Sequence, residues 1–159
     1  MTPDEFALLR DDDTIRTMLE AVCRTTRMGF AAVARVTEEQ WIACQVADRI
    51  EFGLDPGDEL AIKTTICDDI RRTGKGVIID DVDAEQQWRT HPVPILYGFK
   101  SYISLPIIRE DGSVFGTICA IDPEPRTLRS SEIVAVMEDY ARRIAAILDG
   151  APVEAEYGE

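Results

Sequence analysis

The chain has 159 residues, which is enough for one domain with a substantial hydrophobic core. Its 30 acidic and 17 basic residues give a net charge of −13. This balance argues against a nucleic acid or an anionic membrane as a partner, because both require a basic surface. No apolar run is long enough to cross a membrane, and the acidic N-terminal sequence does not have the pattern of a signal peptide. We therefore expect a cytoplasmic protein without a membrane partner.

The four cysteines are scattered along the sequence and form no CxxC pair. In a cytoplasmic protein such thiols are expected to be reduced. The chain has a single histidine, and a zinc site requires closely spaced ligands, so no metal site is predicted.

A helix followed by a β-hairpin is predicted after a short lead-in at residues 1–12. Asp12 or Asp13 can cap the helix, which carries apolar residues at helical spacing and ends near residue 28. Two strands, residues 30–36 and 41–47, then flank a short polar turn.

The middle of the chain is predicted to contain a loop, a helix and a short strand. Residues 48–58 include two glycines and a proline and are predicted to be mostly loop. Thr64 or Thr65 can cap the helix, which ends at Gly74. The apolar residues 77–79 form the strand, which ends at a pair of aspartates.

Residues 82–100 show the least regular pattern of the chain. A long irregular segment in a compact domain is usually functional or mobile. This segment contains Trp88, His91 and Tyr97. We therefore predict that this segment, called the lid below, is functional or mobile.

Residues 97–122 are predicted to form a second hairpin, because Asp111-Gly112 separates two apolar runs. Pro106 in the first run indicates an edge strand or a bulge. Gly116 in the second run indicates that a ligand or another strand approaches the backbone closely.

The last helix is predicted to begin after Ser130 or Ser131 and to reach about Leu148. Apolar residues along it alternate at gaps of four and three, the spacing of a coiled-coil seam, so we predict a homodimer through the terminal helices. Residues 149–159 are predicted to be a flexible tail or a linker to an output module. The predicted seam consists of Ile133, Met137, Tyr140, Ile144 and Ile147.

Three motifs together resemble a GAF domain, over about residues 13–148. They are an aromatic-x-Ser-Tyr-Ile-Ser-x-Pro-Ile run at 99–107, an Asp-Gly-x-x-x-Gly-Thr-x-Cys-x-x-Asp run at 111–122 and a Pro-x-x-Leu-x-x-Ser-Glu run at 125–132. The resemblance is to the GAF domains of bacterial sensor histidine kinases and related signalling proteins, and more distantly to those of phytochromes and cyanobacteriochromes. It implies an α+β fold, in which a central antiparallel sheet carries the N- and C-terminal helices on one face and the lid on the other.

The resemblance also implies a ligand site between the sheet and the lid. Several candidate side chains have a second, purely structural interpretation. Cys67 could attach a chromophore or sense redox state, or it could be a small buried residue. The aspartates could receive a ligand's NH groups or cap a turn, His91 could bind a ligand or hold the loop, and the aromatic residues could line a pocket or fill the core. The candidate ligand-binding residues are Cys67, Asp80, Asp81, Trp88, His91, Tyr97, Phe99, Tyr102 and Ser104.

We therefore predict a non-catalytic regulatory domain that binds a small molecule, such as a non-covalent tetrapyrrole or a small metabolite, and signals to an output domain in the same chain. Three alternatives stay open. They are a ligand-free dimerisation scaffold, a thiol-based redox sensor or enzyme similar to methionine sulfoxide reductases, and a bilin-binding domain. The usual bilin-attaching cysteine is absent beside His91, and the Asn-Lys-x-x-Phe pattern typical of cyclic nucleotide binding is absent too.

Overall fold

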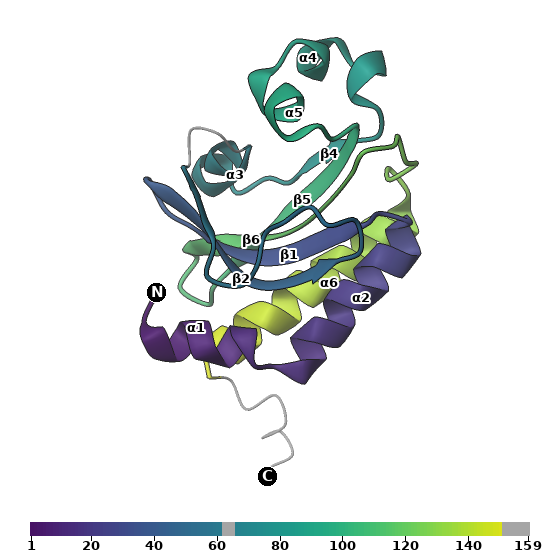
Figure 1. Ribbon diagram of the computed structural model, residues 1–159. Helices are drawn as coiled ribbons and strands as arrows, with labels where there is room; N and C mark the ends of the chain where they lie inside the picture. The colour runs from purple at the N-terminus through teal and green to yellow at the C-terminus, as the bar shows by residue number, and fades with distance from the viewer. Residues whose placement is uncertain (62–65, 151–159) are drawn as a thin grey trace.

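An antiparallel sheet with helices on both of its faces forms the fold (Figure 1). The computed structural model describes residues 1–61 and 66–150. Within this part, the strands are β1 (Phe30–Val36), β2 (Gln40–Asp48), β3 (Glu59–Ala61), β4 (Val77–Ile79), β5 (Ser101–Ile108) and β6 (Val114–Asp122). The helices are α1 (Pro3–Arg10), α2 (Asp13–Thr26), α3 (Cys67–Thr73), α4 (Gln86–Arg89), α5 (Pro92–Tyr97) and α6 (Ser131–Leu148).

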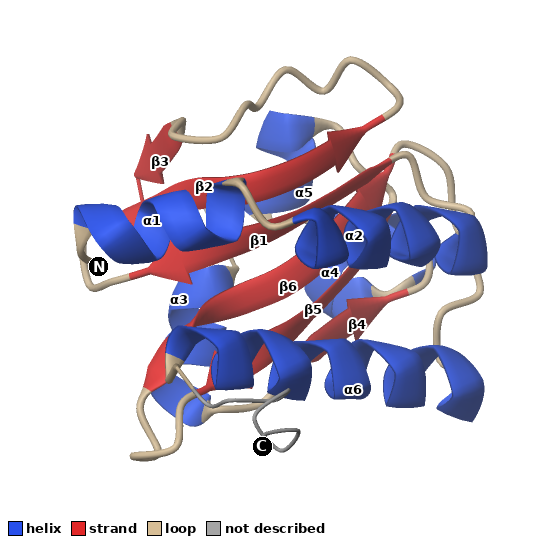
Figure 2. Ribbon diagram, turned by 90° about the horizontal axis from the view of Figure 1, so that it is seen from below, coloured by secondary structure: helices blue, strands red, loops and turns tan. Residues whose placement is uncertain are grey.

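The six described strands follow the order β3-β2-β1-β6-β5-β4, and all neighbours are antiparallel. Helices α1, α2 and α6 cover one face, whereas α3, α4 and α5 lie on the other (Figures 1 and 2). The predicted fold class, with the terminal helices on one face and the lid on the other, is confirmed. The predicted caps of the two long helices are also present. Asp12 accepts the Ile15 N–H at 2.9 Å, and Ser130 caps α6.

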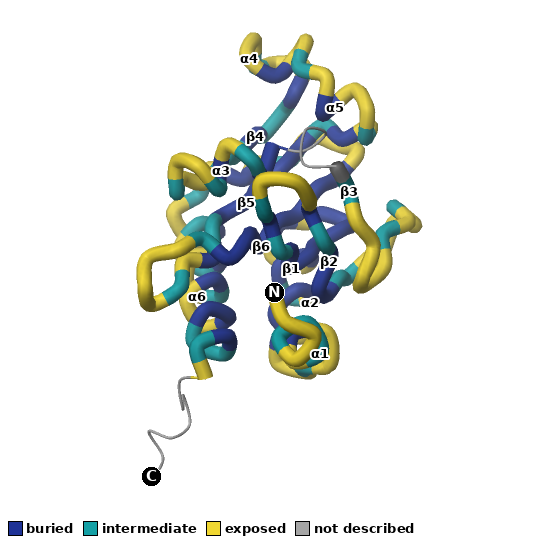
Figure 3. The backbone as a smooth tube through the Cα atoms, turned by 90° about the vertical axis from the view of Figure 1, so that its left-hand side faces the viewer, coloured by how far each residue is buried: buried dark blue, intermediate teal, exposed yellow. Residues whose placement is uncertain are grey.

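Side chains along the central strands point alternately to the two faces of the sheet, and this creates two apolar layers. Along β5, Ile103, Leu105 and Ile107 pack against the helices, in what we call the helix-side core. Tyr102 points to the opposite face and packs beneath the lid, in the lid-side core. The central strands are buried between the two layers, whereas the outer surface of the lid is exposed (Figure 3). Side chains along β5 therefore alternate between the two cores.

The second hairpin shows why Pro106 and Gly116 are tolerated. β4 pairs only with Tyr102–Ser104, so β5 is locally an edge strand at Pro106, and a register shift follows between Ile107 and Ile108. The close neighbour of Gly116 is another strand, because a Cβ atom there would lie 1.8 Å from the carbonyl oxygen of Ala34 on β1. Both features belong to the sheet.

The structure differs from the sequence expectations at three places. Residues 3–10 of the expected lead-in form α1, in which Thr2 and Glu5 make a reciprocal capping box. The segment expected to be loop is followed directly by β3, which pairs with β2. Thr64 and Thr65, the expected caps, lie outside the described residues, and α3 begins at Cys67 without a side-chain cap.

The lid is more regular than the sequence pattern indicates. It contains a 3-10 turn at Val82–Ala84 and the two short helices α4 and α5. Proline at the start of α5 and Gly98 in the left-handed conformation at its end explain its short length. Local turn chemistry therefore builds most of the lid.

The predicted seam on α6 lies mainly inside the domain. Ile133, Met137 and Ile144 are buried in the helix-side core against the sheet. Tyr140 and Ile147 are partly buried beside that core. Three of the five seam residues are therefore occupied by the chain's own sheet and are not available to a second subunit, so a homodimer through the terminal helices stays a prediction.

Arg109, at the end of β5, joins both terminal helices. Its guanidinium group lies 2.9 Å from Glu5 on α1 and 2.9 Å from Asp149 at the end of α6, and it donates to the Leu148 carbonyl at 3.2 Å. The Glu110 N–H also donates to Asp149 at 2.9 Å. Hydrogen bonds from the Thr2 backbone and Arg109 lower the pKa of Glu5, and those from the Glu110 backbone and Arg109 lower the pKa of Asp149. We call this set the Arg109 clamp.

We predict that Arg109→Met lowers the free energy of unfolding by about 1–2 kcal/mol at pH 7, because it removes charge-assisted hydrogen bonds from a partly buried site. The matched variant Arg142→Met removes an exposed ion pair with Asp139 and should cost less than about 0.5 kcal/mol. Urea denaturation measures both values.

The pH dependence of the Arg109 effect follows from its two carboxylates. Their pKa values are lowered in the folded state, so the stabilisation is present above the ordinary carboxyl pKa of about 4. It is lost as the pH falls through the lowered values. The difference between the wild type and Arg109→Met should shrink over that range. The clamp would be contradicted if the difference in unfolding free energy stayed the same below that pH range. It would also be contradicted if Arg142→Met lost as much stability as Arg109→Met.

Candidate functional site

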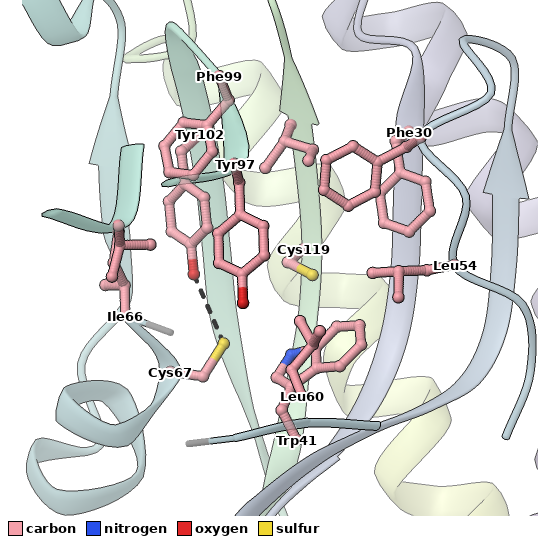
Figure 4. A pocket seen from close by; sticks show the side chains of 13 residues that line it. Phe30, Trp41, Leu54, Leu60, Ile66, Cys67, Tyr97, Phe99, Tyr102 and Cys119 are labelled. Atoms are coloured by element: carbon pink, nitrogen blue, oxygen red, sulfur yellow. Dashed lines mark hydrogen bonds between the residues drawn. The ribbon is translucent and has the colours of Figure 1, made fainter. Parts of the chain in front are cut away.

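A small apolar cavity lies between the sheet and the lid (Figure 4). Its volume is about 50 Å³, which is room for a few water-sized groups. Among the described residues that line it, none carries a charge. The cavity is thus the interior of the lid-side core, left incompletely filled.

Four of the predicted site residues line this cavity: Cys67, Tyr97, Phe99 and Tyr102. They come from the start of α3, the end of α5, the following turn and β5, so the lid and the sheet each contribute. The rings of Phe99 and Tyr102 stack with centroids 5.3 Å apart and an angle of 24°. These four assignments agree with a site beneath the lid.

Sequence reasoning missed the opposite wall of the cavity. Most of the additional lining residues lie on β1, β2, β3 and β6 and on the loop after β2. Alternation along β1 and β2 could have indicated that Phe30 and Trp41 face the lid. The loop residues carry no such signal. The missed residues include Phe30, Trp41, Phe52, Leu54, Leu60 and Cys119.

The two predicted aspartates lie away from the cavity and have structural roles. Asp80 accepts the Leu128 N–H at 3.0 Å and lies 3.6 Å from Arg129. Asp81 caps the 3-10 turn, accepting the N–H of Asp83 at 3.1 Å. These carboxylates connect the end of β4 to the lid and to the approach to α6.

Trp88 and His91 form part of the lid and do not line the cavity. Their rings lie 5.1 Å apart, and Nδ1 of His91 accepts the N–H of Val93 at 3.1 Å, capping α5. Trp88 is buried in the lid-side core. The histidine therefore fixes the loop, as one of its two interpretations predicted.

A small cluster of polar side chains lies at one end of the cavity. Sγ of Cys67 is 3.5 Å from Oη of Tyr102 and 3.5 Å from Oγ1 of Thr117. The hydroxyl of Tyr97 points toward this end as well (Figure 4). Ser104, the remaining predicted residue, is fully buried, and its hydroxyl group lies beside the Cys67 thiol and the Tyr102 hydroxyl.

The thiols at the cavity are protonated at neutral pH. Burial raises the pKa of Cys67, although hydrogen bonds from Tyr102 and Thr117 oppose that effect. Burial also raises the pKa of Cys119, and the neighbouring Cys67 adds to the shift. Burial likewise raises the pKa of Tyr102 well above its ordinary value. These groups therefore act as neutral hydrogen-bonding groups, because a nucleophilic cysteine requires the thiolate.

An open cleft adjoins the cavity on its outer side. It has a volume of about 440 Å³ and shares Phe52, Tyr97 and Phe99 with the cavity lining. The ring of Phe52 lines both spaces and lies 4.9 Å from the ring of Phe30 and 6.3 Å from that of Tyr97. The carboxylate of Asp48 holds this loop by accepting the N–H groups of Phe52 and Gly53, each at 3.0 Å.

The part of the chain that the structure describes contains neither a candidate metal site nor a candidate membrane-spanning helix. No group of three or more His, Cys, Asp or Glu side chains there could hold a metal ion. None of the helices in the same residues has the length and apolar character needed to span a membrane.

Comparison with solved structures finds the same fold in proteins of low sequence identity. The GAF domain of an Acinetobacter phosphoenolpyruvate-protein phosphotransferase is 10% identical, with a TM-score of 0.67, over 98% of this chain and 99% of that chain. The type II free methionine-R-sulfoxide reductase of Thermoplasma acidophilum is 14% identical, with a TM-score of 0.67, over 92% and 96%. The PixJ GAF domain of Thermosynechococcus elongatus is 12% identical, with a TM-score of 0.64, over 98% and 95%.

A comparison with curated protein sequences finds no match. The family model of the GAF domain, in contrast, matches residues 10–149. The matched region contains every strand of the sheet and both long helices. The chain therefore belongs to the GAF domain family.

Proposed function

We propose that this GAF domain is the sensory part of a cytoplasmic signal-transduction protein, for example a histidine kinase of a two-component system. A small molecule binds between the sheet and the lid. The observation that carries this proposal is the cavity beneath the lid. Protein interiors are normally close-packed, and the described side chains leave this space unfilled. Binding there shifts the domain between two states and changes the activity of an output module.

The hairpin of β5 and β6 supplies a route for the signal. Tyr102, near one end of β5, lines the cavity, and Arg109, just after the other end, holds the last turn of α6. A ligand that displaces Tyr102 would therefore act on the clamp that joins both terminal helices. The ligand must bind the two states with different affinities for this coupling to operate.

Two chemical functions of GAF-fold relatives fit this chain less well. A reductase or a covalently attached bilin would need a reactive thiol, whereas Cys67 and Cys119 are buried with raised pKa values and the lid has no cysteine. A non-covalent tetrapyrrole would need a much larger cavity than about 50 Å³ and cationic partners for its carboxylates, and no cation lies among the described lining residues.

The second candidate is a ligand-free scaffold, which the small size of the cavity favours. In that case the aromatic residues beneath the lid are core, and the domain serves to join subunits. A helical dimer would have to use Tyr140 and Ile147 together with exposed residues of α6, because the other seam residues are buried.

We predict that the freshly purified wild-type protein carries a small molecule in native mass spectrometry. Cys119→Ile should lose this extra mass, because the longer side chain on β6 fills the cavity. Cys44→Ile is the matched control, since Cys44 is equally buried but lies in the helix-side core on the opposite face. It should retain the mass. A wild-type protein without bound mass would favour the scaffold, as would equal retention by both variants.

We also predict that no cysteine of the native protein reacts rapidly with the thiol reagent DTNB at pH 8. All four thiols are buried, and burial raises the pKa of Cys44 to about 11. All four should react once the protein is unfolded in guanidinium chloride. A thiol that reacts within seconds in the folded state, and is lost in Cys67→Ser, would restore the redox interpretation.

A further inference from the structure

We infer that the molecule bound beneath the lid is an uncharged, planar aromatic compound bearing one hydroxyl group, which enters by displacing the rings of Phe52 and Tyr97. This inference rests on the proposed sensory function and narrows the class of ligand.

The charge of the ligand follows from the lining. The cavity has no charged side chain among its described lining residues, and burying an unpaired charge costs several kcal/mol. The outer cleft has two acidic residues and no basic one among those that line it. One of them, Asp122, already accepts the N–H groups of Gly29 and Glu124 and pairs with Arg126 at 3.1 Å. An anion would therefore meet no cationic partner among the described lining residues, and a cation would have to leave its charge in the open cleft.

The shape of the ligand follows from the aromatic walls. Phe99 and Tyr102 stack on one side of the cavity, while Phe30 lies on the other (Figure 4). The ring of Phe52 lies 4.9 Å from that of Phe30. Rings arranged in this way offer faces and edges to a planar molecule between them. An aliphatic chain could fill the same space, but it would leave the ring interactions unused.

The hydroxyl group of the ligand follows from the polar end of the cavity. The Cys67 thiol and the Tyr102 hydroxyl lie there at 3.5 Å from each other, a usual distance for a hydrogen bond to sulfur, and both remain neutral. The buried Ser104 hydroxyl lies beside them. A neutral ligand group that both donates and accepts matches these side chains, because thiols and hydroxyls themselves both donate and accept.

The route of entry follows from the two adjoining spaces. The inner cavity of about 50 Å³ is too small for an aromatic ring, whereas the outer cleft has about 440 Å³. The rings of Phe52 and Tyr97 separate them, with centroids 6.3 Å apart. Outward rotation of Phe52 joins the two spaces, and the loop that carries Phe52 lies at the surface, held by Asp48.

The test compares four probes on the full chain by ¹H–¹⁵N NMR titration: phenol, 2-naphthol, toluene and benzoate. Phenol should bind with a dissociation constant at least tenfold below that of benzoate and several-fold below that of toluene. The largest shifts should occur at the amides of Cys119 and Ile121, which line the cavity. Phe52→Ala should bind 2-naphthol more tightly than the wild type, because the passage is open.

Two tyrosine variants test the polar end. Tyr102→Phe should remove most of the preference for phenol over toluene, and Tyr140→Phe, which loses the same hydroxyl from α6 on the opposite face, should retain it. The probe comparison on the wild type needs no variant, so a poorly folded Tyr102→Phe leaves the test intact.

The outcomes separate this inference from the proposed function. Benzoate binding as tightly as phenol would overturn the ligand class, as would a charged molecule retained in native mass spectrometry, and in both cases a sensory site would stand. Failure of all four probes to bind, together with an empty wild-type protein, would overturn both. Selective binding of phenol and 2-naphthol, reduced by Tyr102→Phe only, supports the inference.

Discussion

The alternation of side chains along β1, β6 and β5 is the constraint on which the rest of this structure depends. Each of these strands is covered on both faces, so one set of apolar residues packs against the helices and the other beneath the lid. The two layers have different tasks. The helix side is filled mainly by Ile, Leu, Val, Met and Ala, whereas most of the buried aromatic side chains lie on the lid side, which contains the cavity.

Close approach of the strands keeps this sheet in register. Gly116 brings β6 so near to β1 that no side chain fits between them. The register shifts after Ile107, and Arg109, the residue that follows β5, reaches both terminal helices. The hairpin that forms a wall of the cavity is thus the element that holds the end of α6. This connection gives the proposed sensory function a physical path across the domain.

The candidate residues divide according to where their polar groups lie. Asp80, Asp81 and His91 are chemically versatile, but each is committed to backbone N–H groups that build the lid. Cys67, Tyr97 and Tyr102 have their polar atoms at the cavity instead. Sequence alone could not distinguish these two groups, because an Asp or a His is suited equally to capping and to binding. The distinction depends on which way a lid of short helices turns its side chains.

The sequence by itself determined the two long helices with their caps and the second hairpin, because period, capping and turn residues are local signals. Its motifs indicated the fold class through their resemblance to the GAF family. It also determined that something approaches Gly116 closely. Only the tertiary structure decided that the neighbour is β1, that β3 joins the sheet edge, and that the heptad spacing on α6 serves the chain's own core. It also decided which aromatic residues meet beneath the lid, since Phe30, Trp41 and Phe52 come from separate segments that only the sheet brings together. Spacing along a chain records which residues can share a face, and packing alone determines what that face meets.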